Sequence, residues 1–130
     1  MLTYRDSIAW QKAMDLAAAV YEVTRTFPKE ELFGLTSQLR RASVSVASNI
    51  AEGQGRLTAG ESAHFPGMAR GSVLEVSTQL ELAIRFHPGI TEDLKVVTDQ
   101  SVELTKILNA IPTNLRNTKA KPEPFTSAAN

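Results

Sequence analysis

Residues 35–53 read LTSQLRRASVSVASNIAEG, and this stretch decides the fold. Its apolar residues recur every three or four positions, which is the spacing that places side chains on one face of an α-helix. This face consists of Leu35, Leu39, Ala42, Val46 and Ile50. Gly53 then supplies the residue type best suited to the left-handed position after a helix. The stretch therefore predicts a helix that ends at Gly53 and turns one face toward a core.

Three further segments show the same period, at residues 6–27, 58–86 and 92–111. No alternating pattern typical of strands competes with them. Short connections between successive long helices predict an all-α, antiparallel, up-down-up-down four-helix bundle over residues 1–116. The predicted core positions outside residues 35–53 are Trp10, Ala13, Leu16, Ala17, Val20, Val23, Thr24, Phe27, Phe65, Ala69, Ser72, Val76, Leu80, Ala83, Phe86, Leu94, Val97, Ser101, Leu104, Leu108 and Ile111.

The predicted helix ends follow from capping residues and prolines. Thr3 or Asp6 is a suitable cap for the first helix, which Phe27-Pro28 ends because the residue before proline disfavours helical geometry. Thr58 to Glu61 has the form of a capping box at the start of the third helix. Pro66 lies near the ninth residue of that helix, where proline costs about 3 kcal/mol. We expect a kink or bulge at residues 62–67.

Composition places the chain among folded globular proteins. Its 130 residues include 42% hydrophobic and 22% charged side chains, which predicts one domain with a real core. Residues 117–130 have no hydrophobic period and contain two prolines, so we expect a disordered tail. No apolar run is long enough to span a membrane and no signal peptide begins the sequence, which predicts a cytoplasmic protein.

Charge and cysteine content exclude several classes of function. The absence of cysteine excludes disulfides, thiol nucleophiles and thiolate metal sites. Fourteen basic and fourteen acidic residues give a net charge of zero, so no overall field attracts the monomer to nucleic acid. Binding to a polyanion would therefore require local clustering. The candidate contacts are Arg40, Arg41, Arg56, Arg70 and Arg85.

These arginines are scattered among acidic residues along the sequence, so a solvated or salt-bridged role is the simplest interpretation. A symmetric oligomer would repeat each of them around a ring and could form a basic belt. Aromatic residues make up only 6% of the chain. We expect no exposed aromatic platform for base stacking, so recognition would depend on shape and charge.

A second apolar strip lies on residues 35–53, behind the face that points to the core. Val44, Ala47 and Ala51 form this strip beside Arg40. A helix that is apolar on two sides is usually buried on two sides. In a small bundle we expect the second burial to come from another copy of the chain, so these three residues are candidate contacts of a homo-oligomer. The alternative is that they are isolated apolar residues at the surface.

The joint between the second and third helices concentrates polar residues and glycines. Asn49, Glu52, Gly53, Gly55 and Arg56 fall within eight positions. They can pair with backbone groups and fix the angle between two helices, since helix ends leave backbone groups without partners. Alternatively, Arg56 and the amides that open the third helix form a notch for an anion such as phosphate.

Catalytic and metal-binding patterns are incomplete. Glu61-x-x-His64 resembles half of a di-iron site, but His87 has no glutamate three positions before it to complete the pair. The serines show no adjacent base and orienting carboxylate. We therefore expect no enzyme activity, no cofactor and no bound metal, with a ferritin-like metalloenzyme as the least favoured hypothesis.

Several motifs resemble one protein family in order and spacing. They are Tyr4-Arg5-Asp6, Trp10-Gln11-Lys12-Ala13, Phe27-Pro28, Gly34-Leu35, Gln38-Leu39-Arg40-Arg41-Ala42, Ser48-Asn49-Ile50-Ala51-Glu52-Gly53, Gly55-Arg56 and Gly71-Ser72. The family is the bacterial four-helix-bundle family named after proteins encoded in intervening sequences of large-subunit ribosomal RNA genes. The resemblance covers roughly residues 4–110. The chain departs from the family pattern at His64, Pro66 and Gly67.

The resemblance implies a ring-shaped homopentamer without known catalysis. It extends to the accessory bundle protein of diversity-generating retroelements, which implies nucleic acid or a ribonucleoprotein as a partner. The first hypothesis is a non-enzymatic, homo-oligomeric scaffold or adaptor. The alternative is a protein that binds RNA or DNA directly through arginines arrayed around the oligomer.

Overall fold

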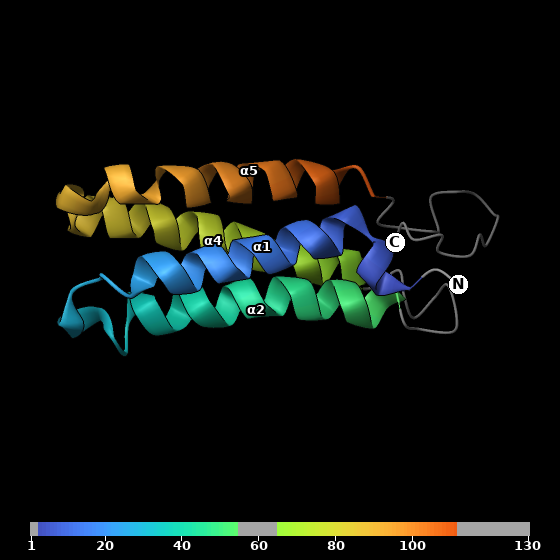
Figure 1. Ribbon diagram of the computed structural model, residues 1–130, viewed down its shortest axis with the longest axis horizontal. Coiled ribbons are helices and arrows are strands. Elements are labelled where there is room, and N and C mark those ends of the chain that lie inside the picture. The colour runs from blue at the N-terminus through green and yellow to red at the C-terminus, as the bar shows by residue number, and fades with distance from the viewer. Residues whose placement is uncertain (1–2, 55–64, 112–130) are drawn as a thin grey trace.

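The computed structural model describes residues 3–54 and 65–111, and these residues form a four-helix bundle (Figure 1). The helices are α1 (Ile8–Thr24), α2 (Leu35–Gln54), α4 (Phe65–Phe86) and α5 (Lys95–Asn109). Short 3-10 turns occupy Tyr4–Asp6, Lys29–Glu31, Pro88–Ile90 and Glu92–Leu94, and the described residues contain no strand. The predicted all-α four-helix bundle is confirmed. Residues 112–116 of the predicted domain and the predicted tail at 117–130 lie outside the described residues.

Successive helices run in opposite directions along the long axis of the molecule (Figure 1). The register of α2 against α4 follows from two side-chain contacts: Gln79 Nε2 donates to Gln38 Oε1 at 3.3 Å, and Ser45 Oγ lies 2.8 Å from Ser72 Oγ. A step of seven residues forward in α2 is thus a step of seven back in α4. Two contacts fix α4 against α5 in the same way.

Those two contacts are the Ser77 Oγ–Ser101 Oγ hydrogen bond of 3.1 Å and the Arg70 Nη1–Leu108 carbonyl bond of 3.1 Å. Seven residues back in α4 again correspond to seven forward in α5. Three of these four contacts join two polar side chains, and the fourth joins the Arg70 side chain to a backbone carbonyl. The contacts that are partly buried favour one rotation of each helix, because polar groups removed from water need partners.

α1 begins at Ile8, two residues after the predicted start at Asp6. Ser7 caps α1, because its Oγ accepts the Trp10 amide at 3.1 Å. Thr3 and Asp6, the expected caps, form a capping box around the preceding 3-10 turn instead. Trp10 also packs edge-on against Tyr4, with ring centroids 5.2 Å apart. The Tyr4–Asp6 motif thus closes one end of the bundle rather than extending the helix.

The core takes residues from all four helices, including the fully buried Leu16, Leu39, Leu80 and Leu104. Burial of each such side chain contributes about 1.5–3 kcal/mol. In α1, Leu16 is buried as predicted, whereas Trp10 and Ala17 are only half-buried and Ala9 is buried without having been predicted. Phe86 was wrongly placed in the core: its side chain is 60% exposed, because α4 ends there and the core ends with it.

The described part of α4 begins at Phe65, which puts Pro66 in its first turn. Proline is tolerated there because the amides of a first turn have no intrahelical acceptor. Pro66 is buried rather than exposed at a kink. The predicted helix start at Thr58 and residues 62–64 of the predicted kink lie outside the described residues.

The second apolar side of α2 is partly buried within the single chain. Ala47 is only 7% exposed and belongs to the core, so the expectation that its burial requires a second copy is wrong. Each helix of a four-helix bundle has two neighbours, and α2 packs against both α1 and α4. Val44 remains 45% exposed and Ala51 is half-buried.

Within residues 3–54 and 65–111, none of the helices combines the length and the hydropathy that crossing a lipid bilayer requires.

Candidate functional site

The polar residues predicted at the helix joint divide between the α2–α4 contact and the residues that are not described. Asn49 Nδ2 donates to the Ser45 carbonyl at 2.9 Å and to Ser45 Oγ at 3.0 Å. Because Ser45 also contacts Ser72, Asn49 completes a small polar cluster between α2 and α4. Asn49 therefore stabilises α2 and its contact with α4. Its bond to the Ser45 carbonyl is the pairing with a backbone group that the sequence predicted.

Gly53 does not cap the helix as predicted. It lies within α2, which continues to Gln54, and it is buried. Glu52 is exposed. Gly55 and Arg56 lie outside the described residues, as does the predicted anion-binding notch.

Two of the five candidate arginines are held by contacts within the bundle. Arg70 donates to the Leu108 carbonyl, and burial lowers the pKa of its guanidinium. Arg40 Nε donates to Thr24 Oγ1 at 2.9 Å, and Nη2 donates to the Tyr21 carbonyl at 3.4 Å. Both side chains donate hydrogen bonds to backbone carbonyls in the last turn of a neighbouring helix, where the helix dipole favours a positive charge.

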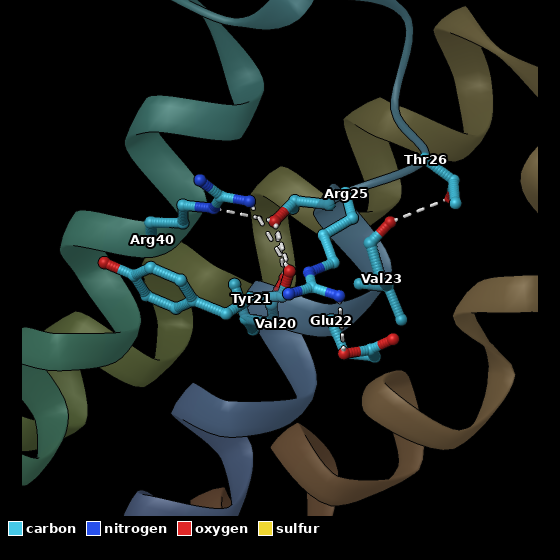
Figure 2. A network of polar contacts seen from close by, with 8 residues as sticks. Val20, Tyr21, Glu22, Val23, Arg25, Thr26 and Arg40 are labelled. Atoms are coloured by element: carbon cyan, nitrogen blue, oxygen red, sulfur yellow. Dashed lines mark hydrogen bonds and ion pairs between the residues drawn. The ribbon is translucent and has the colours of Figure 1, made fainter.

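Figure 2 shows the Arg40 contact in detail. The guanidinium reaches from α2 to the C-terminal turn of α1, over the Tyr21 ring at 4.6 Å from its centroid. Thr24 Oγ1 in turn donates to the Val20 carbonyl at 2.7 Å. The geometry fixes Arg40 and the Tyr21 ring together, so the ring carries a cation on one face.

Arg41 is exposed, and it has no hydrogen bond or ion pair with another described residue. It lines two adjoining shallow depressions of about 430 and 420 Å³, which also share Phe33 and Ser37. The first is lined further by Gln38, Ala42, Ser45, Glu75 and Gln79, and the second by Tyr21, Leu32, Thr36 and Arg40. We call the residues Tyr21, Leu32, Phe33, Arg40 and Arg41 the Phe33 surface.

The Phe33 surface overturns one expectation from the sequence. Phe33 is 91% exposed, so the chain does carry an exposed aromatic platform. Sequence reasoning missed it because aromatic content alone does not reveal exposure. A signal was present: Phe33 lies two positions before Leu35, and this spacing puts it outside the apolar face of α2.

The turn that carries Phe33 is held from two sides by Glu31. Glu31 Oε1 accepts the Leu35 amide at 3.1 Å, and Oε2 lies 2.8 Å from His87 Nε2 at the end of α4. The bond to His87, followed by the bond to the Leu35 amide, keeps the pKa of the Glu31 carboxyl below its ordinary value. The carboxylate therefore caps α2 and ties the α1–α2 connection to the α4–α5 connection.

The remaining candidate arginine, Arg85, is exposed in the last turn of α4. Fifteen residues separate it from Arg70, which is about 22 Å along a helix. The four candidate arginines within the described residues therefore do not form one patch in a single chain. Of these four, Arg40 and Arg41 lie beside each other on a common surface.

The described residues form neither a metal-binding cluster nor an activated serine. In those ranges no three His, Asp or Glu side chains lie close enough together to hold a metal ion. Glu61 and His64, the half-motif of a di-iron site, lie outside the ranges. The serine hydroxyls at the helix contacts bond to one another or to backbone carbonyls, as Ser43 does to the Arg40 carbonyl at 3.0 Å.

The chain matches the model of a known protein family. The family model described as 23S rRNA-intervening sequence protein matches residues 5–110. This range includes the four helices and the Phe33 surface. No curated protein matches the chain.

Proposed function

This chain belongs to the 23S rRNA-intervening sequence protein family, and we propose that it is a non-enzymatic, homo-oligomeric helical scaffold. Its role in this proposal is to present the same surface several times around a symmetry axis. The number of copies expected from the family resemblance is five. A protein or ribonucleoprotein partner would bind the assembled ring rather than a single copy.

The observation that carries this proposal is the apolar surface that α2 and its leading turn keep after intramolecular packing. Val44 is 45% exposed on the outer side of α2, and Leu32 is exposed in the turn before its first residue. An apolar strip of this kind is buried when copies associate. Ala51 adds a half-buried position on the same side.

A pair of valine substitutions tests the proposal. Val44 on α2 and Val102 on α5 are 45% and 46% exposed, so a glutamate at either position is equally accommodated in a monomer. Sedimentation velocity at micromolar concentration is expected to show an oligomer for the unmodified chain and for Val102→Glu. Val44→Glu is expected to dissociate it, because an interface core does not tolerate an unpaired charge.

A single monomeric species for the unmodified chain would reject the scaffold proposal. Equal dissociation by both glutamates would place the contact elsewhere on the bundle. Circular dichroism of each variant would establish that the helices are still formed.

A second candidate function is direct binding of nucleic acid, which the Phe33 surface favours. There, Arg41 has no ion-pair partner among the described residues, and Arg40 lies next to it. Phosphate groups are bound by such cations, and repetition around an oligomer would add their contributions. Electrophoretic mobility of labelled RNA at several salt concentrations tests this function. Unchanged mobility at low salt would reject it.

A further inference from the structure

The Phe33 ring projects from the bundle at the point where two depressions meet. A phenyl ring that is 91% exposed loses the free energy that burial would provide, so its position is unfavourable in the free monomer. The turn that carries it is anchored to two helices. Glu31 holds the turn through the Leu35 amide on one side and through His87 on the other.

The two depressions differ in chemistry. Both contain Arg41. The one toward α4 is otherwise lined by hydroxyl, amide and carboxylate groups, including those of Ser37, Gln38, Glu75 and Gln79. These groups can donate and accept hydrogen bonds. The one toward α1 adds the Arg40 guanidinium beside the Tyr21 ring. An occupant that covers Phe33 would therefore meet Arg41, with hydrogen-bonding groups on one side and a second positive charge on the other.

We infer that the Phe33 surface binds single-stranded nucleic acid, with one base stacked on the Phe33 ring and the adjoining phosphates facing Arg41 and Arg40. This inference rests on the second candidate function and names its site. Bases stack on exposed aromatic rings whatever their sequence, and cations beside the ring follow the backbone. The carboxylate of Glu75 fits the base side, because carboxylates accept from exocyclic amino groups.

The charge distribution favours this occupant over an apolar segment of a protein. Exposed rings at protein interfaces are usually surrounded by other apolar side chains. Among the residues that line the two depressions with Phe33, Leu32 is the one exposed aliphatic side chain. The other exposed or half-exposed lining residues are mostly polar or charged. A nucleotide combines a flat apolar face, a polar edge and an anionic backbone, and each has a counterpart here.

Fluorescence anisotropy with the full chain tests the inference. The probes are labelled oligo(A) RNA and oligo(A) DNA of about 12 nucleotides, a length within the usual range for single-strand sites. Phe33→Ala is expected to weaken binding at least about fivefold, from the loss of one stacked base. Phe33→Trp is expected to retain binding, because indole stacks as well as phenyl.

The matched control is Phe86→Ala, since Phe86 is another exposed phenylalanine but lines neither depression. It is expected to leave affinity unchanged. Arg41→Gln is expected to weaken binding and to reduce the salt slope by about one phosphate contact. In Phe33→Trp, added nucleic acid is expected to quench the new indole emission beyond any change seen with Trp10 alone.

The possible results distinguish a failure of nucleic-acid binding as a function from a failure of Phe33 as its site. No binding of either probe at low salt rejects the second candidate function and the inference with it. Binding that Phe33→Ala and Phe86→Ala leave equally intact rejects this site alone. Dissociation of an oligomer by Phe33→Ala, with quenching absent in Phe33→Trp, would identify Phe33 as a contact between protein chains and overturn the inference. A preference for RNA or for DNA identifies the natural strand.

Discussion

Glu31 and His87 are 56 residues apart in sequence, yet Glu31 Oε2 lies 2.8 Å from His87 Nε2. The contact joins the connection between α1 and α2 to the connection between α4 and α5. The other carboxylate oxygen of Glu31 accepts the first amide of α2. One side chain therefore closes one end of the bundle and fixes the turn that carries Phe33.

Removal of the Glu31 charge should destabilise the protein at neutral pH. Glu31→Gln keeps the size of the side chain but weakens two charge-assisted hydrogen bonds, so we expect a loss of about 1–2 kcal/mol in the free energy of unfolding. Urea denaturation at pH 7 measures it. Glu30→Gln is the matched control, because Glu30 lies in the same turn but is exposed.

The same carboxylate should also make stability depend on acid pH. Its folded-state pKa is lowered, so its contribution is complete above the ordinary glutamate pKa of about 4.3 and is lost as pH falls through the folded value. Between about pH 5 and 3, Glu31→Gln should therefore have a flatter stability profile than the unmodified chain. Parallel profiles would show that Glu31 makes no such contribution.

Gly34 should be sensitive to substitution because of Glu31. A Cβ at position 34 would lie 2.8 Å from Glu31 Oε1, the atom that accepts the Leu35 amide. The carboxylate must move and the cap is lost, so we expect Gly34→Ala to destabilise by about 1 kcal/mol. In a Glu31→Ala background the effect should disappear. Additive effects in this double-mutant cycle would contradict the mechanism.

Gly71→Ala should have the opposite effect. Gly71 lies exposed in the interior of α4, and a Cβ there would meet no atom within 4 Å. Alanine restricts the unfolded chain and favours the helix, so we expect a gain of about 0.5–1 kcal/mol. Thermal unfolding should show a rise of a few degrees in Tm. A lower Tm would indicate that this face is covered in the assembled protein.

Arg70 should stabilise the fold rather than bind nucleic acid. Its guanidinium bonds to the Leu108 carbonyl, and Arg70→Met removes that bond while keeping the aliphatic part of the side chain. We expect a loss of about 1 kcal/mol in unfolding free energy with little change in RNA affinity. Arg41→Met should reverse this pattern, since exposed Arg41 has no hydrogen-bond or ion-pair partner to lose within residues 3–54 and 65–111. A fall in RNA affinity for both variants would show that Arg70 also contacts the nucleic acid.

Much of the fold could be predicted because it depends on local periodicity. Leu39, Val46, Leu80 and Leu104 all lie in the core as their spacing indicated. The errors arose where a helix ends or has two neighbours. Phe86 follows the period of α4 but lies beyond the core, and Ala47 is buried by the same chain instead of a second copy.

The sequence by itself determined the helices, their apolar faces and the family, because each depends on residues close together along the chain. Only the tertiary structure decided which polar residues meet. It separated the tethered Arg70 from the exposed Arg41, and it brought Glu31 to His87. It also left Phe33 outside the core between two depressions. The physical reason is that these features depend on the register between helices, which is set by packing across the whole bundle and is not encoded in any one segment.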